Sequence, residues 1–259
     1  FGVNAIKDKN ELVIIGKDGK ETKFEYGKDF SPTSFTANNT LESEVLFVGY
    51  GLSVAGKLGE GYNSYSDLNA TGKMVLALRY VPERVKGERR QKLMRSAALV
   101  RKATVARSHG AKGVIIVSGP NSEKSNKLIP LNYVRGATST GVVALSGNHK
   151  LANALLAAAG KGDLKKIQDA LDKENPHAPM GFALPGVKIR VTTAVKKVTK
   201  PDHNIIAILP PGVEGENVEY VMIGAHYDHL GYNDGSINPK GGNPGRIHNG
   251  ADDNGSGTV

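Results

Sequence analysis

The residues best suited to chemistry lie in two short motifs near the end of the sequence. His226 and Asp228 follow the apolar run at 221–223, and Asp252 and Asp253 lie in a glycine-rich stretch. A short apolar run that leads into small residues predicts a buried parallel strand. Ligands of parallel sheets bind beyond the carboxyl ends of the strands, and residues two apart on a strand share a face. We therefore expect His226 and Asp228 to point together into a site at the end of a sheet.

This combination of side chains predicts metal binding. A neutral imidazole is a good zinc ligand, and a carboxylate nearby can accept a hydrogen bond from its second ring nitrogen. Asp252 and Asp253 supply further oxygen donors, and since a carboxylate has two oxygens, one aspartate could bridge two metal ions about 3.5–4 Å apart. Each motif alone is more often structural, because His-x-Asp pairs are common and Asp-Asp-Asn-Gly makes an ordinary turn. The two motifs together, with an apolar run before them, favour the metal site.

Residues 224–231 and 249–257 together resemble the beginning of the catalytic domain in metallopeptidase family twenty-eight. Members of this family are zinc aminopeptidases and related carboxypeptidases that use two zinc ions. The resemblance implies that His226 binds one zinc and that Asp252 bridges both. It also implies that Asp228 is a catalytic residue that orients His226.

The resemblance further implies groups that lie beyond position 259. The family uses a glutamate base and additional glutamate, aspartate and histidine ligands further along the chain. We therefore expect residues 1–259 alone to be inactive and to bind zinc weakly or not at all. Asp253 is expected to shape the turn beside the bridging carboxylate.

The function that this resemblance implies is peptide hydrolysis. The chain would be the N-terminal portion of a two-zinc metallo-exopeptidase, an aminopeptidase that removes N-terminal residues from peptides. Two Zn²⁺ ions would be its cofactors, and its location would be secreted, periplasmic or at the cell surface. One alternative is a non-catalytic receptor or binding ectodomain on the same fold, for which the zinc-binding residues would be unnecessary. A serine hydrolase that uses Ser256 is a weaker alternative, because the chain lacks a GxSxG nucleophile elbow there.

The residues before these motifs resemble a protease-associated domain. The resemblance rests on four short motifs, at 48–51, 65–68, 72–76 and 110–116. The fold class is therefore expected to be α/β. We expect a mixed β/α protease-associated-like domain with an N-terminal β segment at 1–185, and the first strands of a doubly wound zinc-exopeptidase sheet at 186–259. The stretch 175–186, with its prolines, is the predicted boundary.

Hydrophobic periodicity predicts the main elements. Apolar residues recur at helical spacing from 88 to 109, so one helix is expected there. Further helices are expected at 150–159 and after an N-cap at Asp163. Strands are expected at 11–15, 22–26, 44–48, 73–79, 113–117, 142–145, 187–195 and 204–209.

Composition narrows the class of partner. The 259 residues include no cysteine, which excludes disulfides and thiolate metal sites. No stretch approaches the ~18 consecutive apolar residues of a membrane span. The net charge is +9, but residues 71–113 carry twelve Lys and Arg against two Glu, so the remainder is about neutral. Basic residues on a helix are more often a solvated face than a phosphate track, and no nucleic-acid module accompanies them. We therefore expect a peptide substrate, no nucleic acid and no membrane span; the oligomeric state is not specified.

We predict that the basic stretch 71–113 has no sequence-specific affinity for nucleic acid, because it lacks interleaved aromatic residues and a groove-binding element. Fluorescence anisotropy with DNA and RNA at ~0.15 M salt should detect only weak, salt-sensitive binding. Tight and sequence-selective binding at that salt would contradict the prediction.

Overall fold

The chain divides into two compact units, Phe1–Thr199 and Lys200–Val259. The computed structural model describes residues 2–57, 60–131, 139–173, 181–198, 201, 203–210, 212, 219, 221–226, 229, 231–232 and 247–258.

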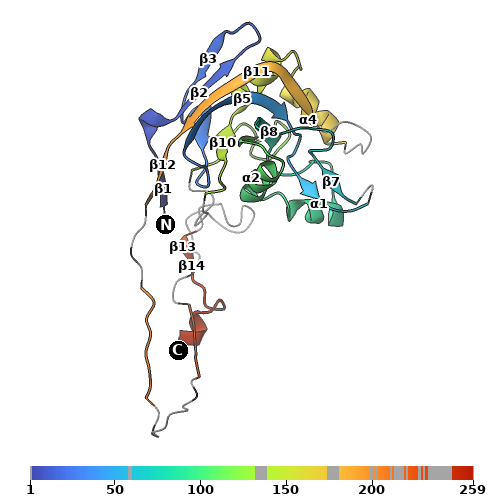
Figure 1. Ribbon diagram of the computed structural model, residues 1–259. Coiled ribbons are helices and arrows are strands. Elements are labelled where there is room, and N and C mark those ends of the chain that lie inside the picture. Colours follow the sequence, from blue (N-terminus) through green and yellow to red (C-terminus); the bar gives the residue numbers. More distant parts are fainter. Residues whose placement is uncertain are drawn as a thin grey trace. The chain divides into compact units, whose positions relative to one another are not determined.

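The first unit is built on one eight-stranded mixed sheet, in the order β3-β2-β11-β5-β8-β9-β10-β4 (Figure 1). The neighbours among β5, β8, β9 and β10 are parallel, and all other pairs are antiparallel. The strands are β2 (Glu11–Ile15), β3 (Glu21–Phe24), β4 (Phe30–Pro32), β5 (Asn39–Phe47), β8 (Met74–Leu78), β9 (Gly113–Val117), β10 (Val143–Gly147) and β11 (Phe182–Thr193). The four helices among the described residues are α1 (Gly87–Met94), α2 (Leu99–Ser108), α3 (His149–Ala158) and α4 (Leu164–Leu171). The α/β class is confirmed.

Alternating residues of the central strands supply two separate hydrophobic cores. Along β8, Leu76 and Leu78 belong to a core shared with α3 and α4, whereas Val75 and Ala77 belong to a core shared with α2. Successive side chains of a strand point to opposite faces, so the two cores lie on the two faces of the sheet. Strands buried on both faces read as continuous apolar runs, as β8 and β9 do.

The single helix predicted over residues 88–109 is wrong, because the structure has two helices, α1 and α2, with a break between them. At the break Ala98 has a ψ of 137°, which is not helical. Leu93 and Ala97, before or at the break, belong to the core of α3 and α4, whereas Leu99 and Ala103 belong to the opposite core. One straight helix could not bury both sets, so the chain turns between them.

Local signals predicted α3 and α4 well. The side chain of Asn148 accepts a hydrogen bond from the Leu151 N–H and begins α3. Asp163 caps α4 as predicted, since its carboxylate accepts from the Lys165 and Lys166 N–H groups. Gly160 has a φ of +71°, a conformation that favours glycine and ends α3.

The structural units divide later in the chain than the boundary predicted at 185/186. The prediction assumed that the strand after Gly186 opens a new sheet, but β11 runs from Phe182 to Thr193 and pairs with both β2 and β5. The register shifts between Leu184 and Lys188, so the bulged Pro185 and Gly186 bend the strand without ending it. The proline-rich stretch is therefore partly inside the sheet of the first unit, and its residues 174–180 lie outside the described ranges.

The remaining elements are small. They are β1 (Gly2–Ala5) paired with β12 (Val195–Val198), β6 (Ser53–Val54) paired with β7 (Tyr62–Asn63), β13 (Gly231–Tyr232) paired with β14 (Ile247–His248), and the short 3-10 helices η1 (Lys7–Lys9) and η2 (Gly255–Thr258). Residues 203–210 and 221–226 contain no strand, although strands were predicted at 204–209 and 221–223. Ile205 is 82% exposed and Met222 is 95% exposed, so these apolar runs have no packed neighbour among the described residues.

A buried lysine joins the carboxyl ends of two central strands. Lys102 of α2 is only 1% exposed. Its ammonium donates to the carbonyl oxygens of Leu78 at 3.1 Å, Tyr80 at 2.9 Å and Tyr50. Burial lowers the pKa of Lys102 to about 7. The three carbonyls account for all three N–H donors of an ammonium group, so the side chain fastens α2 to the loops after β5 and β8.

A second buried polar network holds α4 against the same loops. The carboxylate of Asp172 accepts from the hydroxyl of Tyr50 at 2.5 Å, from the Glu83 N–H at 3.0 Å and from the amide of Asn121 at 2.7 Å. Gln168 donates to the Tyr50 hydroxyl at 3.0 Å. Burial and the neighbouring Asp172 raise the pKa of Tyr50, which keeps its hydroxyl a donor.

We predict that Lys102→Met lowers the free energy of unfolding by about 3 kcal/mol at neutral pH, because buried carbonyl oxygens lose their donors. The pKa of Lys102 is lower in the folded chain than its value of 10.5 in the unfolded chain. Between about pH 7 and 10.5 the unfolded chain therefore binds more protons than the folded chain, so the free energy of unfolding of the wild type should rise relative to that of the variant as the pH increases. Urea unfolding followed by far-ultraviolet circular dichroism measures both effects, with the exposed Lys92→Met as control. If the difference in free energy of unfolding between wild type and variant stays constant over this pH range, the pKa of Lys102 is not lowered by burial.

Candidate metal centre

The two sequence motifs meet in the second unit, although they are far apart in the chain. The backbone N–H of His226 donates to the side-chain oxygen of Asn254 at 2.7 Å. Gly257 lies against Ala225, because a Cβ placed on Gly257 would be 2.9 Å from the Cβ of Ala225. The segment that carries the histidine is therefore bound directly to the turn that carries the aspartates.

The aspartate turn has a compact backbone that depends on glycine. The carbonyl of Gly250 accepts from the N–H groups of Asp253 at 3.2 Å and Gly255 at 2.9 Å, and the Asp253–Asn254 peptide bond is cis. Gly250 has a φ of +72°, and an added Cβ would lie 2.5 Å from the Cβ of His229. No other residue fits this position without a clash, since the left-handed conformation also disfavours side chains. The turn is thereby held close to the His229 side chain.

The structure places three of the four predicted motif residues. His226, Asp252 and Asp253 are exposed, and Asp228 lies outside the described residues. The ring of His229 comes within 3.8 Å of the Asp253 carboxylate, a pair that the sequence did not single out. Across the described ranges, no three His, Asp or Glu side chains form a group that could hold a metal ion.

The donor chemistry of the site nevertheless suits zinc. Imidazole nitrogen and carboxylate oxygen are both zinc donors. Because the His226 N–H is occupied by Asn254, the backbone beside the imidazole is fixed while the ring itself stays exposed. Exposed side chains on a fixed backbone can take up an ion without first breaking a buried interaction.

Asn254 is the functional candidate that sequence reasoning missed. It was treated as part of a turn, and its bond to His226 spans 28 residues. A contact between residues so far apart leaves no periodic pattern in the sequence. The only hint in the sequence is that an amide side chain immediately follows the aspartate pair.

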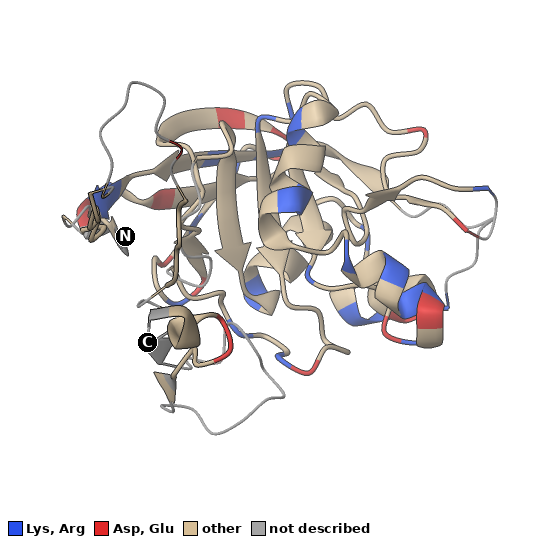
Figure 2. Ribbon diagram, turned by 90° about the horizontal axis from the view of Figure 1, so that it is seen from below, with Lys and Arg blue, Asp and Glu red and all other residues tan. Residues whose placement is uncertain are grey.

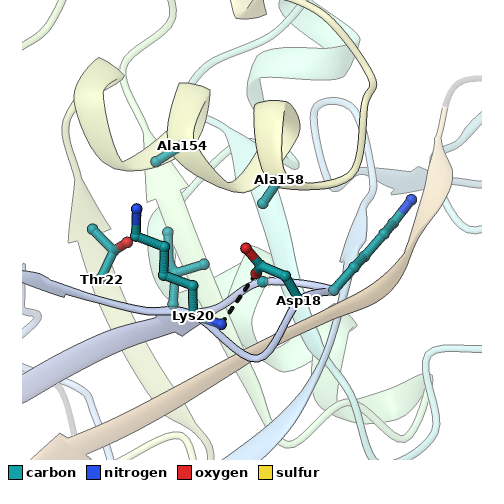
Figure 3. A pocket seen from close by; sticks show the side chains of 8 residues that line it. Asp18, Lys20, Thr22, Ala154 and Ala158 are labelled. Carbon is teal, nitrogen blue, oxygen red and sulfur yellow. Dashed lines mark hydrogen bonds between the residues drawn. The ribbon is translucent and has the colours of Figure 1, made fainter.

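A pocket of the first unit lies apart from this chemistry. It has a volume of about 310 Å³ and lies between the β2–β3 hairpin and α3 (Figure 3). Ala154 and Ala158 of α3 line one side, and Lys20 and Thr22 line the other. The carboxylate in its lining, Asp18, accepts from the Lys20 backbone N–H at 3.1 Å and so serves the hairpin turn.

Basic positions recur along the helices of the first unit (Figure 2). Among those of residues 71–113, Lys92, Arg95 and Arg101 are exposed. Arg89 donates to the carbonyls of Glu60 and Gly61, and Arg90 pairs with Glu83 at 3.3 Å. These contacts give the two arginines a structural role.

One segment of the chain matches a known family. Residues 204–259 match the family described as Peptidase family M28. This match confirms, for that segment, the resemblance predicted from the two motifs. No curated protein matches the chain. Among the described residues, no helix has the length and apolar character needed to span a membrane.

Two solved structures resemble the chain weakly. One is an aminopeptidase from Aneurinibacillus sp. strain AM-1, with 16% identity over 75% of this chain and 32% of the other, and a TM-score of 0.42. The other is BSAP, a zinc aminopeptidase from Bacillus subtilis, with 16% identity over 75% of this chain and 33% of the other, and a TM-score of 0.34. The chain therefore spans about a third of the length of these aminopeptidases. Likenesses at this level support no further conclusion.

We predict that Asn254→Ala loosens the contact between the two motifs, because the His226 N–H loses its acceptor. A hydrogen bond of about 1 kcal/mol corresponds to roughly fivefold faster amide exchange at His226. Exchange measured by nuclear magnetic resonance tests this, with the exposed Asn249→Ala as control. Equal His226 exchange rates in the two variants would contradict the contact.

Proposed function

We propose that the protein carrying residues 1–259 is a zinc-dependent metallopeptidase, and that it acts as an aminopeptidase on peptides. The observation that carries this proposal is the hydrogen bond between His226 and Asn254, which joins the histidine motif to the aspartate motif. The family match over residues 204–259 supports the same function.

In this proposal His226 and Asp252 would hold the metal, and Asp252 has two carboxylate oxygens with which it could serve two Zn²⁺ ions. Bound zinc would supply Lewis acidity for the peptide carbonyl. Asp228 would orient the His226 ring by accepting a hydrogen bond from it. Asn254 fixes the backbone at His226, and Gly250 allows the turn to approach the histidine segment.

We assign residues 1–185 to a protease-associated-like domain with an N-terminal β segment and residues 186–259 to the peptidase domain, although β11 and β12 pair with strands of the first unit. The buried side chains of the first unit, such as Lys102 and Asp172, are engaged in fastening helices to strand ends. Its resemblance to a protease-associated domain implies a role in substrate access. A secreted, periplasmic or cell-surface location follows from the family resemblance alone.

We predict that His226→Ala and Asp252→Asn each lower the bound zinc and abolish peptidase activity in the natural protein that carries this chain. Asp228→Asn should keep most of the metal and lose activity, since changing a residue that orients a metal ligand typically costs ~10–100-fold in metal affinity or activity. The measurements are zinc content by mass spectrometry and turnover of aminoacyl-nitroanilides. His203→Ala is the matched control, because this exposed histidine precedes the family segment.

Two outcomes would separate the parts of this proposal. Full zinc content in the His226→Ala variant would overturn the ligand assignment. Absence of both bound zinc and peptidase turnover in the unchanged protein would instead favour a binding ectodomain on the same fold.

A further inference from the structure

The chain changes sheets at Ala194. β11 belongs to the eight-stranded sheet, whereas β12, which begins at Val195, pairs only with β1 in a separate two-stranded sheet. This two-stranded sheet, β1 with β12, is called the ribbon below. The second unit begins at Lys200, shortly after β12 ends at Val198. The covalent connection to the second unit therefore leaves through the ribbon.

The side chain of Asn10 holds both strands at the base of the ribbon. Its oxygen accepts from the Ala194 N–H at 2.9 Å. Its nitrogen donates to the carbonyls of Ala194 at 3.0 Å and Ile6 at 2.7 Å. The Ile6 N–H donates to the same Ala194 carbonyl at 3.0 Å. Asn10 is only 5% exposed, so these bonds are largely protected from water.

The side chain of Asn38 makes the corresponding pair of bonds at the next residue. Its oxygen accepts from the Val195 N–H at 2.8 Å, and its nitrogen donates to the Val195 carbonyl at 2.9 Å. A side-chain amide offers the same donor and acceptor as a peptide group. Backbone groups of successive strand residues point to opposite edges. Asn10 and Asn38 therefore take the place of a neighbouring strand on the two edges of the chain where it leaves the sheet.

We propose that Asn10 and Asn38 form a fixed joint that sets the direction in which the ribbon leaves the eight-stranded sheet. An isolated two-stranded ribbon is marginally stable in water, and backbone groups without partners are costly when buried. The two amides supply partners for the backbone N–H and carbonyl groups of Ala194 and Val195, and at the Ala194 carbonyl the Ile6 N–H is a second donor. Both are positioning residues, because they act through the backbone and touch no part of the candidate metal centre among the described contacts.

A pair of spin labels measures the direction of the ribbon directly. The chain has no cysteine, so Lys23→Cys on β3 and Lys197→Cys on β12 provide two unique labelling sites. Pulsed electron paramagnetic resonance on the labelled chain should give a narrow distance distribution. In the Asn38→Ala variant the distance distribution should become at least about twice as wide, because the ribbon loses hydrogen bonds where it leaves the sheet and a two-stranded ribbon is only marginally stable alone. Adding Asn10→Ala should broaden it further.

The controls separate a loose joint from a damaged fold. Asn69→Ala removes an exposed side chain that accepts only from the nearby Thr71 N–H at 3.0 Å, and it should leave the width unchanged. Far-ultraviolet circular dichroism verifies that each variant is folded. If the buried Asn10 variant fails to fold, the exposed Asn38→Ala decides alone. A broad distribution in the otherwise unchanged chain, or an unchanged width in Asn38→Ala, would overturn the proposal.

Discussion

The antiparallel pairing of β11 with both β2 and β5 is the interaction on which the first unit depends. β2 pairs with β3 and β11, so the hairpin of β2 and β3 joins the rest of the sheet only through β11. This pairing brings residues near 11 against residues near 192, which closes the fold between distant parts of the chain. The bulge at Pro185 and Gly186 bends β11 and increases its twist. The bent strand pairs with β5, which adjoins the parallel strands, and with β2, which belongs to the antiparallel part of the sheet.

The sheet closed in this way has a hydrophobic core on each face. At the ends of its strands, buried carbonyl groups need hydrogen-bond donors. At the carboxyl ends of β5 and β8, the carbonyls of Tyr50, Leu78 and Tyr80 converge on one side chain of α2. Lys102 supplies their donors from one face, and Asp172 ties α4 to the same loops from the other. A network of buried polar groups is stabilising only when every donor and acceptor in it has a hydrogen-bond partner. The two networks therefore fix the positions of α2 and α4. The same principle appears at Ala194 and Val195, where the side-chain amides of Asn10 and Asn38 pair with backbone groups.

Features that depend on neighbouring residues could be predicted from the sequence. The N-cap at Asp163 and the apolar run of β9 are of this kind. Features that depend on the whole fold could not. Periodicity from 88 to 109 is continuous, but the break between α1 and α2 arises because the two halves face different cores. The strand at 187–195 was also predicted, but its membership of the first sheet depends on partners that its own pattern does not specify.

The candidate site shows the same division. The chemical types of His226 and Asp252 and the glycine-rich turn could be recognised from their spacing, and the family match over 204–259 agrees with that interpretation. The bond from His226 to Asn254 could not, because it is a contact across 28 residues. It joins the backbone of the segment that carries His226 to the turn that carries Asp252 and Asp253.

The central claim is that His226 and Asp252 are zinc ligands. A crystal of the natural protein, grown with zinc and measured on both sides of the zinc absorption edge, tests it most directly. The account predicts an anomalous peak about 2.0–2.2 Å from a ring nitrogen of His226 and from a carboxylate oxygen of Asp252. A peak bound by other side chains, with His226 and Asp252 both remote from it, would contradict the account.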